Sequence, residues 1–272
     1  MSRVAIIAGT GALPALLAEA LPAGTTLVAA LDGAAAEVPG REILRFRIER
    51  LVPFLDHLEA EGVTRVVFAG GVTRPRLEPE AFDPRTAQLV PRLLAAIGQG
   101  DDAALGAVIG LFEEFGFEVV GAAELRPDLV PGPGVIVGAP TPADTADAAR
   151  AAGIVRDLGR LDIGQGAVVA QGLCLALETL PGTDAMLDFV ASHAAGLRPD
   201  PTGARGVLYK APKPAQDRRI DLPAIGPETV RRAAAAGLAG IAWEAGGAML
   251  IDPAATRAAA AAAGLFLWAR EP

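Results

Sequence analysis

The chain has 272 residues, enough for two domains of ordinary size, and carries a formal net charge of −8. Aromatic residues make up 4% of it, so aliphatic side chains and alanine must build the core. The acidic balance argues against a general nucleic-acid surface and against electrostatic docking on an anionic membrane.

The single cysteine and the first apolar stretch indicate in which cellular compartment the protein is found. Cys174 alone cannot form a disulfide framework or a cysteine metal cluster within the chain. It lies in an apolar run, so we expect it to be a small core residue. The first apolar stretch has no cationic leader and is interrupted by Gly9, Gly11 and Pro14, so we expect neither a signal peptide nor a transmembrane span. The sequence therefore predicts a cytoplasmic protein.

The first part of the chain alternates short apolar runs with helical patterns. We expect strands over 4–8, 25–31, 65–70 and 117–122, and helices over 12–21, 51–62, 89–98 and 100–116. Such alternation indicates a parallel sheet with right-handed crossovers. The sequence therefore predicts an α/β protein whose N-terminal Rossmann-like parallel-sheet domain covers residues 1–132.

A segment rich in proline and glycine, residues 126–142, is predicted to contain the interdomain linker. After it we expect a helix over 143–159, a hairpin of strands 167–170 and 173–178, further strands over 206–210 and within 240–252, a helix over 253–264 and a strand over 265–269. Asp144 and Asp147 are expected to face solvent on the first of these helices. The hairpin predicts a C-terminal mixed α/β domain over residues 133–272.

The opening glycine turn, Gly9-x-Gly11-x-x-Pro14, resembles a dinucleotide fingerprint, and Asp32 follows at about the distance of a ribose-binding acid, ~20 residues. Pro14 breaks the match, because a third glycine is expected there. Backbone N–H groups around Gly11 could still bind a phosphate or a polar head group at the helix N-terminus. A tight turn without a ligand is the alternative.

A second turn, AGGVTRP over residues 69–75, follows the third expected strand. In a parallel sheet it opens on the same edge as the first glycine turn, where ligands of such sheets bind. Arg74 is the candidate ligand cation of this turn. The alternative is an arginine that simply faces solvent.

The second domain carries its polar residues in three places. Asp162 and Gln165 lie in a glycine-rich turn before the hairpin, and Glu178, Thr183 and Asp184 lie where the hairpin passes into a helix. The third place, residues 210–223 (KAPKPAQDRRIDLP), is called the polar loop below. Its prolines stiffen a segment that offers cations such as Lys210 and Lys213 to phosphate oxygens, and carboxylates to a divalent metal or an attacking water. A solvated charged loop is the alternative.

Taken together, the motifs IAGTGALP, FAGGVTRP, GDDAAL, GRLDIGQGAVV, ETLPGTDAML, KAPKPAQDRRIDLPAIGPETV and GLAGIAWEAG resemble the LpxI-type UDP-2,3-diacylglucosamine pyrophosphatases of lipid A biosynthesis. The resemblance covers nearly the whole chain in order. It implies a Mg²⁺-dependent hydrolase that cleaves the pyrophosphate of UDP-2,3-diacylglucosamine by water attack at the sugar-side phosphorus. The products would be UMP and 2,3-diacylglucosamine 1-phosphate, called lipid X.

The resemblance also implies site residues. In the first domain the substrate would be lined by Leu13, Gly71, Val72 and Arg74, and in the second by Gln165, Gly166, Thr183, Asp184 and Lys210. Asp221 matches the essential aspartate of the family. We therefore expect Asp221 to bind Mg²⁺ or orient the water, and Lys210 with Lys213 to neutralise phosphate charge.

Two other functions stay open on the sequence alone. A nucleotide-dependent oxidoreductase would rest on the Gly9 turn and Asp32, and a non-enzymatic nucleotide or lipid carrier would use the polar loop only to grip phosphate. A substrate with two acyl chains adds two hypotheses, namely an apolar chamber and transient contact with the surface of the inner membrane. A homodimer is a further hypothesis.

Overall fold

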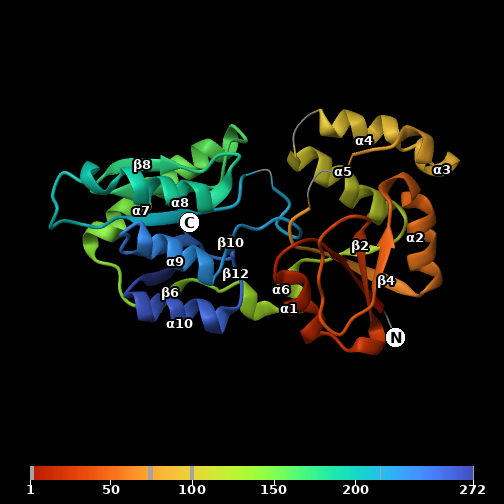
Figure 1. Ribbon diagram of the computed structural model, residues 1–272, viewed down its shortest axis with the longest axis horizontal. Coiled ribbons are helices and arrows are strands. Elements are labelled where there is room, and N and C mark those ends of the chain that lie inside the picture. The colour runs from red at the N-terminus through yellow and green to blue at the C-terminus, as the bar shows by residue number, and fades with distance from the viewer. Residues whose placement is uncertain (1–2, 73–75, 99–100, 215, 272) are drawn as a thin grey trace. The chain divides into compact units, whose positions relative to one another are not determined.

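The computed structural model describes residues 3–72, 76–98, 101–214 and 216–271 (Figure 1). The chain divides into two compact units, Met1–Pro127 and Asp128–Pro272. The division lies inside the segment in which the sequence places the linker. Part of that segment, Gly134–Val137, forms strand β6 of the second unit, because three residues of favourable β character follow Pro131 and Pro133.

The first unit is built on a five-stranded sheet of order β3-β2-β1-β4-β5 with every neighbouring pair parallel. Its strands are β1 (Arg3–Ala8), β2 (Thr26–Leu31), β3 (Ile43–Phe46), β4 (Val63–Ala69) and β5 (Glu118–Val119). The predicted parallel sheet is confirmed, and its order is that of doubly wound folds. The short edge strand β3 has no matching expectation, because its four residues are too few to show a period.

The helices of this unit are α1 (Leu13–Ala20), α2 (Leu51–Ala60), α3 (Pro84–Ala87), α4 (Val90–Ile97), α5 (Asp101–Glu114) and α6 (Ala122–Leu125). Figure 1 shows α1 and α6 on one side of the sheet and α2 on the other. Leu17 of α1, Leu55 and Leu58 of α2 and Phe112 of α5 are fully buried. Both faces of the sheet are thus covered, as an all-parallel sheet requires.

The turns after β1 and β4 are joined to each other. The amide of Thr10 donates to the carbonyl of Gly71 at 2.8 Å, and the amide of Gly71 donates back to Thr10 at 3.0 Å. The backbones approach so closely that a Cβ on Gly9 would lie 2.3 Å from the Gly71 oxygen. Glycine is therefore required at position 9 by this contact with the second turn.

The second unit is built on a six-stranded sheet of order β6-β13-β11-β9-β7-β8. Its further strands are β7 (Gly166–Ala170), β8 (Leu173–Leu177), β9 (Val207–Lys210), β11 (Gly240–Glu244) and β13 (Phe266–Arg270), and β10 (Ala224–Ile225) pairs with β12 (Met249–Leu250) apart from it. Strands β9, β11 and β13 are parallel to one another. Strand β6 is antiparallel to β13, β7 is antiparallel to β9, and β8 is antiparallel to β7. The expected mixed α/β unit and its hairpin are confirmed.

Four helices cover this sheet. One face packs against α7 (Pro142–Arg160), and the other against α8 (Gly182–His193), α9 (Pro227–Ala235) and α10 (Pro253–Ala263) (Figure 1). Across both units, no helix of the described residues combines the length and the apolar character needed to cross a bilayer.

Two expectations about α7 and β8 are wrong. Asp144 and Asp147 are buried, because each carboxylate accepts backbone N–H groups: Asp144 closes the capping box with Thr141, and Asp147 accepts from Gln171 and Gly172 at 2.9 and 2.7 Å. Cys174 is exposed, because β8 is the edge strand of the sheet. An apolar run does not distinguish an edge strand from a central one.

The buried carboxylate of Asp147 holds the turn of the β7–β8 hairpin. We expect Asp147→Ala to lower the free energy of unfolding of the second unit by about 1–3 kcal/mol, because the amides of Gln171 and Gly172 lose their charged acceptor. Asp157→Ala, on the exposed side of the same helix, should cost no more than about 0.5 kcal/mol. Urea unfolding followed by tryptophan fluorescence measures both, since Trp243 and Trp268 belong to this unit. Equal losses in the two variants would contradict the role of Asp147.

Candidate functional site

The candidate site contains three residues that lie beside one another on neighbouring strands of the second sheet. Gly166 of β7 and Trp243 of β11 are both register partners of Lys210 on β9. Register partners on neighbouring strands point to the same face of a sheet, here the face covered by α8 and α9. Lys210 is the last residue of β9, so its side chain lies at the carboxyl edge of the parallel strands, where α/β sheets bind ligands.

The ammonium group of Lys210 is buried in a set of oxygen atoms. The side chain is 4% exposed, and Nζ donates to Thr183 Oγ1 at 2.5 Å and lies 3.6 Å from Glu178 Oε2. Thr183 Oγ1 in turn donates to Glu178 Oε2 at 3.0 Å. Burial lowers the pKa of Lys210, while the carboxylates of Glu178, Asp184 and Asp221 act in the opposite direction.

The polar loop leaves β9 at this edge and carries its charges in pairs. Lys213 Nζ lies 2.5 Å from Asp162 Oδ1, Arg218 lies 2.8 Å from Glu244, and Arg219 lies 2.7 Å from Asp217. The ion pairs of Lys213 and Arg218 tie the loop to the turn before β7 and to the end of β11. These links, together with the burial of Lys210, do not fit a merely solvated charged loop.

The two aspartates of the polar loop have different surroundings, which the sequence does not separate. Asp217 is held by the guanidinium of Arg219, which lowers the pKa of Asp217. Asp221 accepts a hydrogen bond from Gln216 Nε2, and its negative charge opposes the lowering of the Lys210 pKa by burial. Asp221 is therefore the aspartate of this loop that acts on the buried ammonium.

Gln165 supplies an acceptor without a donor. Its backbone oxygen accepts from the amide of Ala211 at 3.1 Å, which joins the turn before β7 to the polar loop. Its side-chain Oε1 is buried and has no hydrogen-bond partner among the described residues. Buried polar atoms are normally paired, so this oxygen is suited to a donor on a bound ligand or an ordered water.

The predicted residues of the second unit therefore come together at one edge of one sheet. They are Gln165, Gly166, Thr183, Asp184, Lys210, Lys213 and Asp221. Asp184 is the most open of the acids around Lys210: its side chain is 56% exposed and lies 3.5 Å from Arg232 Nε. This edge can neutralise an anion with cations and orient a nucleophile with carboxylates.

The predicted residues of the first unit lie at the carboxyl edge of its own sheet. Gly11 and Gly71 are in the two joined turns, and Val72 is exposed beside them. Leu13 is buried at the start of α1, and Arg74 lies outside the described residues. Ligand contact by this group stays a prediction.

The joined turns bear on the oxidoreductase alternative. A dinucleotide fingerprint uses free N–H groups of the glycine turn to bind pyrophosphate. Here the amides of Gly9 and Thr10 donate to Ala69 and Gly71 at 2.7 and 2.8 Å. These two donors are occupied within the protein, which disfavours a dinucleotide at this turn.

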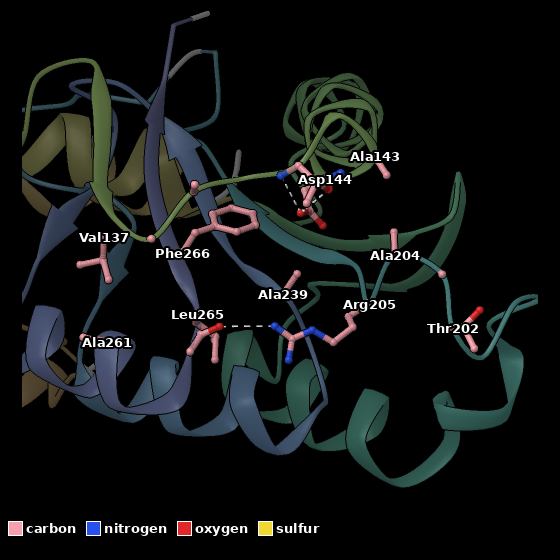
Figure 2. A pocket seen from close by; sticks show the side chains of 15 residues that line it. Val137, Ala143, Asp144, Thr202, Ala204, Arg205, Ala239, Ala261, Leu265 and Phe266 are labelled. Carbon is pink, nitrogen blue, oxygen red and sulfur yellow. Dashed lines mark hydrogen bonds between the residues drawn. The ribbon is translucent and has the colours of Figure 1, made fainter.

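A cavity of about 730 Å³ lies at the other edge of the second sheet, where β9, β11 and β13 begin (Figure 2). Its walls include Val137, Ala239 and Phe266. The charged groups that line it are Asp144, which is engaged in the cap of α7, and Arg205, which donates to the Gly264 carbonyl at 3.4 Å. None of the predicted site residues is among its described lining residues, so we separate this cavity from the candidate site.

Two buried residues of the site, Glu178 and Gln216, have no assigned role in the sequence analysis. Glu178 is 6% exposed, and Gln216, at 8%, bridges the amide of Lys213 and the carboxylate of Asp221. The usable signal for Glu178 is its position directly after a strand, beside a glycine-rich turn. Gln216 gives no such signal, because its contacts depend on how the loop folds back.

Comparison with known proteins shows the family of the chain. The LpxI N-terminal domain family matches residues 3–129, and the LpxI C-terminal domain family matches residues 133–268. The UDP-2,3-diacylglucosamine pyrophosphatase LpxI of Caulobacter vibrioides is 41% identical over 279 residues, which cover 100% of this chain and 99% of that protein. The resemblance seen in the motifs is confirmed, and the chain belongs to the LpxI family.

Proposed function

We propose that this protein hydrolyses the pyrophosphate bond of UDP-2,3-diacylglucosamine, giving 2,3-diacylglucosamine 1-phosphate and UMP, in lipid A biosynthesis. The observation that carries the proposal is the buried ammonium of Lys210 at the carboxyl edge of the second sheet, near Asp221. The full-length relationship to a UDP-2,3-diacylglucosamine pyrophosphatase supports the same substrate. A carrier protein would need the ammonium of Lys210 to bind phosphate, but it would not need the carboxylate of Asp221, because it activates no water.

The residues of the site have two roles in this reaction: some neutralise the charge of the pyrophosphate, and one positions the attacking water or the metal ion. Water attacks the sugar-side phosphorus, a new P–O bond forms, and the bridging P–O bond breaks with UMP as the leaving group. Lys210 and Lys213 offset the negative charge on the pyrophosphate oxygens, which is the main requirement of phosphoryl transfer. Asp221, which accepts a hydrogen bond from Gln216, would orient the attacking water or hold the metal ion.

Mg²⁺ fits the donors present at this edge. In the described part of the chain no three His, Cys, Asp or Glu side chains gather into a metal cluster. Mg²⁺ does not need one, because it is commonly bound by one or two carboxylates together with substrate phosphates and water. Asp221 would be the protein ligand, and the bound ion would neutralise pyrophosphate charge.

We place this reaction in the cytoplasm, with transient contact to the surface of the inner membrane, where a diacylated substrate resides. Support comes from Leu180, which is 96% exposed on the turn after β8, and from Leu161 and Ile163, which are exposed before β7. Leu173 and Leu177 are exposed on the edge strand β8, which supports a homodimer through that edge.

The proposal is tested by incubating the purified protein with UDP-2,3-diacylglucosamine and Mg²⁺ in H₂¹⁸O. We expect UMP and a lipid 1-phosphate that carries the label, and Asp221→Asn should lower kcat by about 10²–10⁴-fold, the range of a positioned acid–base group. Asp217→Asn is the matched control in the same loop and should retain most of the activity. Absence of hydrolysis by the wild-type protein, or label in UMP alone, would contradict the proposal.

The buried ammonium also predicts a pH dependence. Burial lowers the pKa of Lys210, so the ammonium loses its charge as the pH rises through that lowered pKa, before an ordinary lysine would, at about 10.4. We therefore expect kcat/KM to fall on the alkaline side. In Lys210→Arg the guanidinium stays charged, so this alkaline loss should disappear although the plateau is lower. Lys213→Arg is the control and should keep it; an unchanged profile in Lys210→Arg would assign the loss to another group.

A further inference from the structure

The choice of basic residues in this chain is uneven. It contains 24 lysine and arginine residues, and only two of them, Lys210 and Lys213, are lysines. Both lie in the polar loop. Arginine stays charged under all ordinary conditions, whereas lysine is a compact ammonium whose proton affinity follows its surroundings. The two lysines of this chain are therefore basic groups whose protonation depends on the charges around them.

Glu178 is the carboxylate most closely built around Lys210. It follows β8 directly, and its amide donates to the Gly166 carbonyl at 2.8 Å, which fixes its backbone beside the start of β7. Its Oε2 lies 3.6 Å from Lys210 Nζ and accepts the hydroxyl of Thr183 at 3.0 Å. Lys210 itself donates to that hydroxyl at 2.5 Å. The glutamate thus holds the ammonium both directly and through Thr183.

Two glycines leave the space that Glu178 occupies. A Cβ on Gly166 would lie 2.3 Å from Glu178 Oε2, and a Cβ on Gly164 would lie 2.0 Å from its backbone oxygen. Both distances are shorter than non-bonded atoms tolerate. Because Gly166 is also the register partner of Lys210, its missing side chain is what lets the carboxylate reach the ammonium across the sheet.

Three carboxylates face Lys210 from the surrounding elements, and they differ in burial. Asp184 of α8 is more than half exposed and lies near Arg232, and Asp221 of the polar loop accepts a hydrogen bond from Gln216. The side chain of Glu178 is 8% exposed. A carboxylate out of solvent interacts more strongly with a neighbouring charge than an exposed one does. Glu178 is therefore the strongest local counter-charge.

We propose that Glu178 is a positioning residue for the hydrolysis proposed above: it fixes the ammonium of Lys210, directly and through Thr183, and keeps it charged while the pyrophosphate is bound. It acts through Lys210 and does not itself have to touch the substrate. The proposal rests on the proposed function for its role in turnover, but the state of the lysine can be measured without substrate.

The measurement uses the presence of two lysines. In protein labelled with ¹³C at lysine Cε, NMR gives one signal for Lys210 and one for Lys213, and Lys210→Arg assigns them. Removing a nearby negative charge favours the neutral amine, so in Glu178→Gln the Lys210 signal should titrate at lower pH than in the wild type. In Glu178→Asp, which keeps the charge, the midpoint should return toward the wild-type value. The Lys213 signal should be unchanged in both.

Asp162→Asn is the matched control, because it removes a negative charge 2.5 Å from Lys213 Nζ. It should move the Lys213 signal and leave the Lys210 signal in place. An identical Lys210 midpoint in the wild type and Glu178→Gln, or equal shifts in Glu178→Gln and Glu178→Asp, would overturn the proposal. Circular dichroism checks folding, and if Glu178→Gln does not fold, Glu178→Asp alone must give a measurable shift, since its carboxylate is one methylene farther away.

Turnover gives the second readout. In Glu178→Gln the alkaline loss of kcat/KM should move to lower pH together with the NMR midpoint, and kcat should fall by about 10–100-fold, as for other groups that orient a functional side chain. A lower kcat with an unmoved pH profile would indicate a merely structural role and overturn the proposal. Absence of hydrolysis by the wild type would refute the proposed function, while the NMR comparison would still report whether Glu178 controls Lys210.

Discussion

The burial of one positive charge organises the second unit. An ammonium group that leaves water must be met by oxygen atoms and counter-charge, or it loses its proton. Lys210 contacts Thr183 and Glu178, and the charges of Asp184 and Asp221 also favour its charged form. Glycine at position 166 follows from this arrangement, because a side chain there would displace the carboxylate of Glu178. A negative ligand bound at this edge would offset part of the cost of desolvating this cation.

The topology of the second sheet explains why these residues meet. Strand β9 lies in the middle of the sheet, so the side chain of Lys210 has neighbours on both sides, from β7 and β11. The hairpin β7–β8 returns the chain to the same edge and there delivers Glu178 and Thr183. The polar loop then leaves β9 and is tied back by the ion pairs of Lys213 and Arg218. Residues distant in the sequence thus share one edge of the sheet, and the cavity of about 730 Å³ at the other edge contains none of them among its described lining residues.

Much of the fold follows from periodicity, and much of the site does not. Repeated strand and helix patterns predict the parallel first sheet and the β7–β8 hairpin correctly, because most of their strands are long enough to show an apolar run, whereas the four residues of β3 are not. Asp144, Asp147 and Cys174 are misplaced, since burial depends on partners and strand order that no local pattern contains. The polar loop is recognisable by its composition and by family resemblance. The separation of Asp217 from Asp221, and the part played by Glu178, require the contacts themselves.

The central claim is that the buried ammonium of Lys210 meets the pyrophosphate of the substrate. The most direct test is to add Mg²⁺ and a non-hydrolysable methylene-bridged analogue of UDP-2,3-diacylglucosamine to protein labelled at lysine Cε. We expect the Lys210 signal to shift saturably, at the analogue concentration that inhibits turnover, and to titrate at higher pH in the complex because a bound anion favours the charged amine. Inhibition by the analogue with an unchanged Lys210 signal would contradict the account.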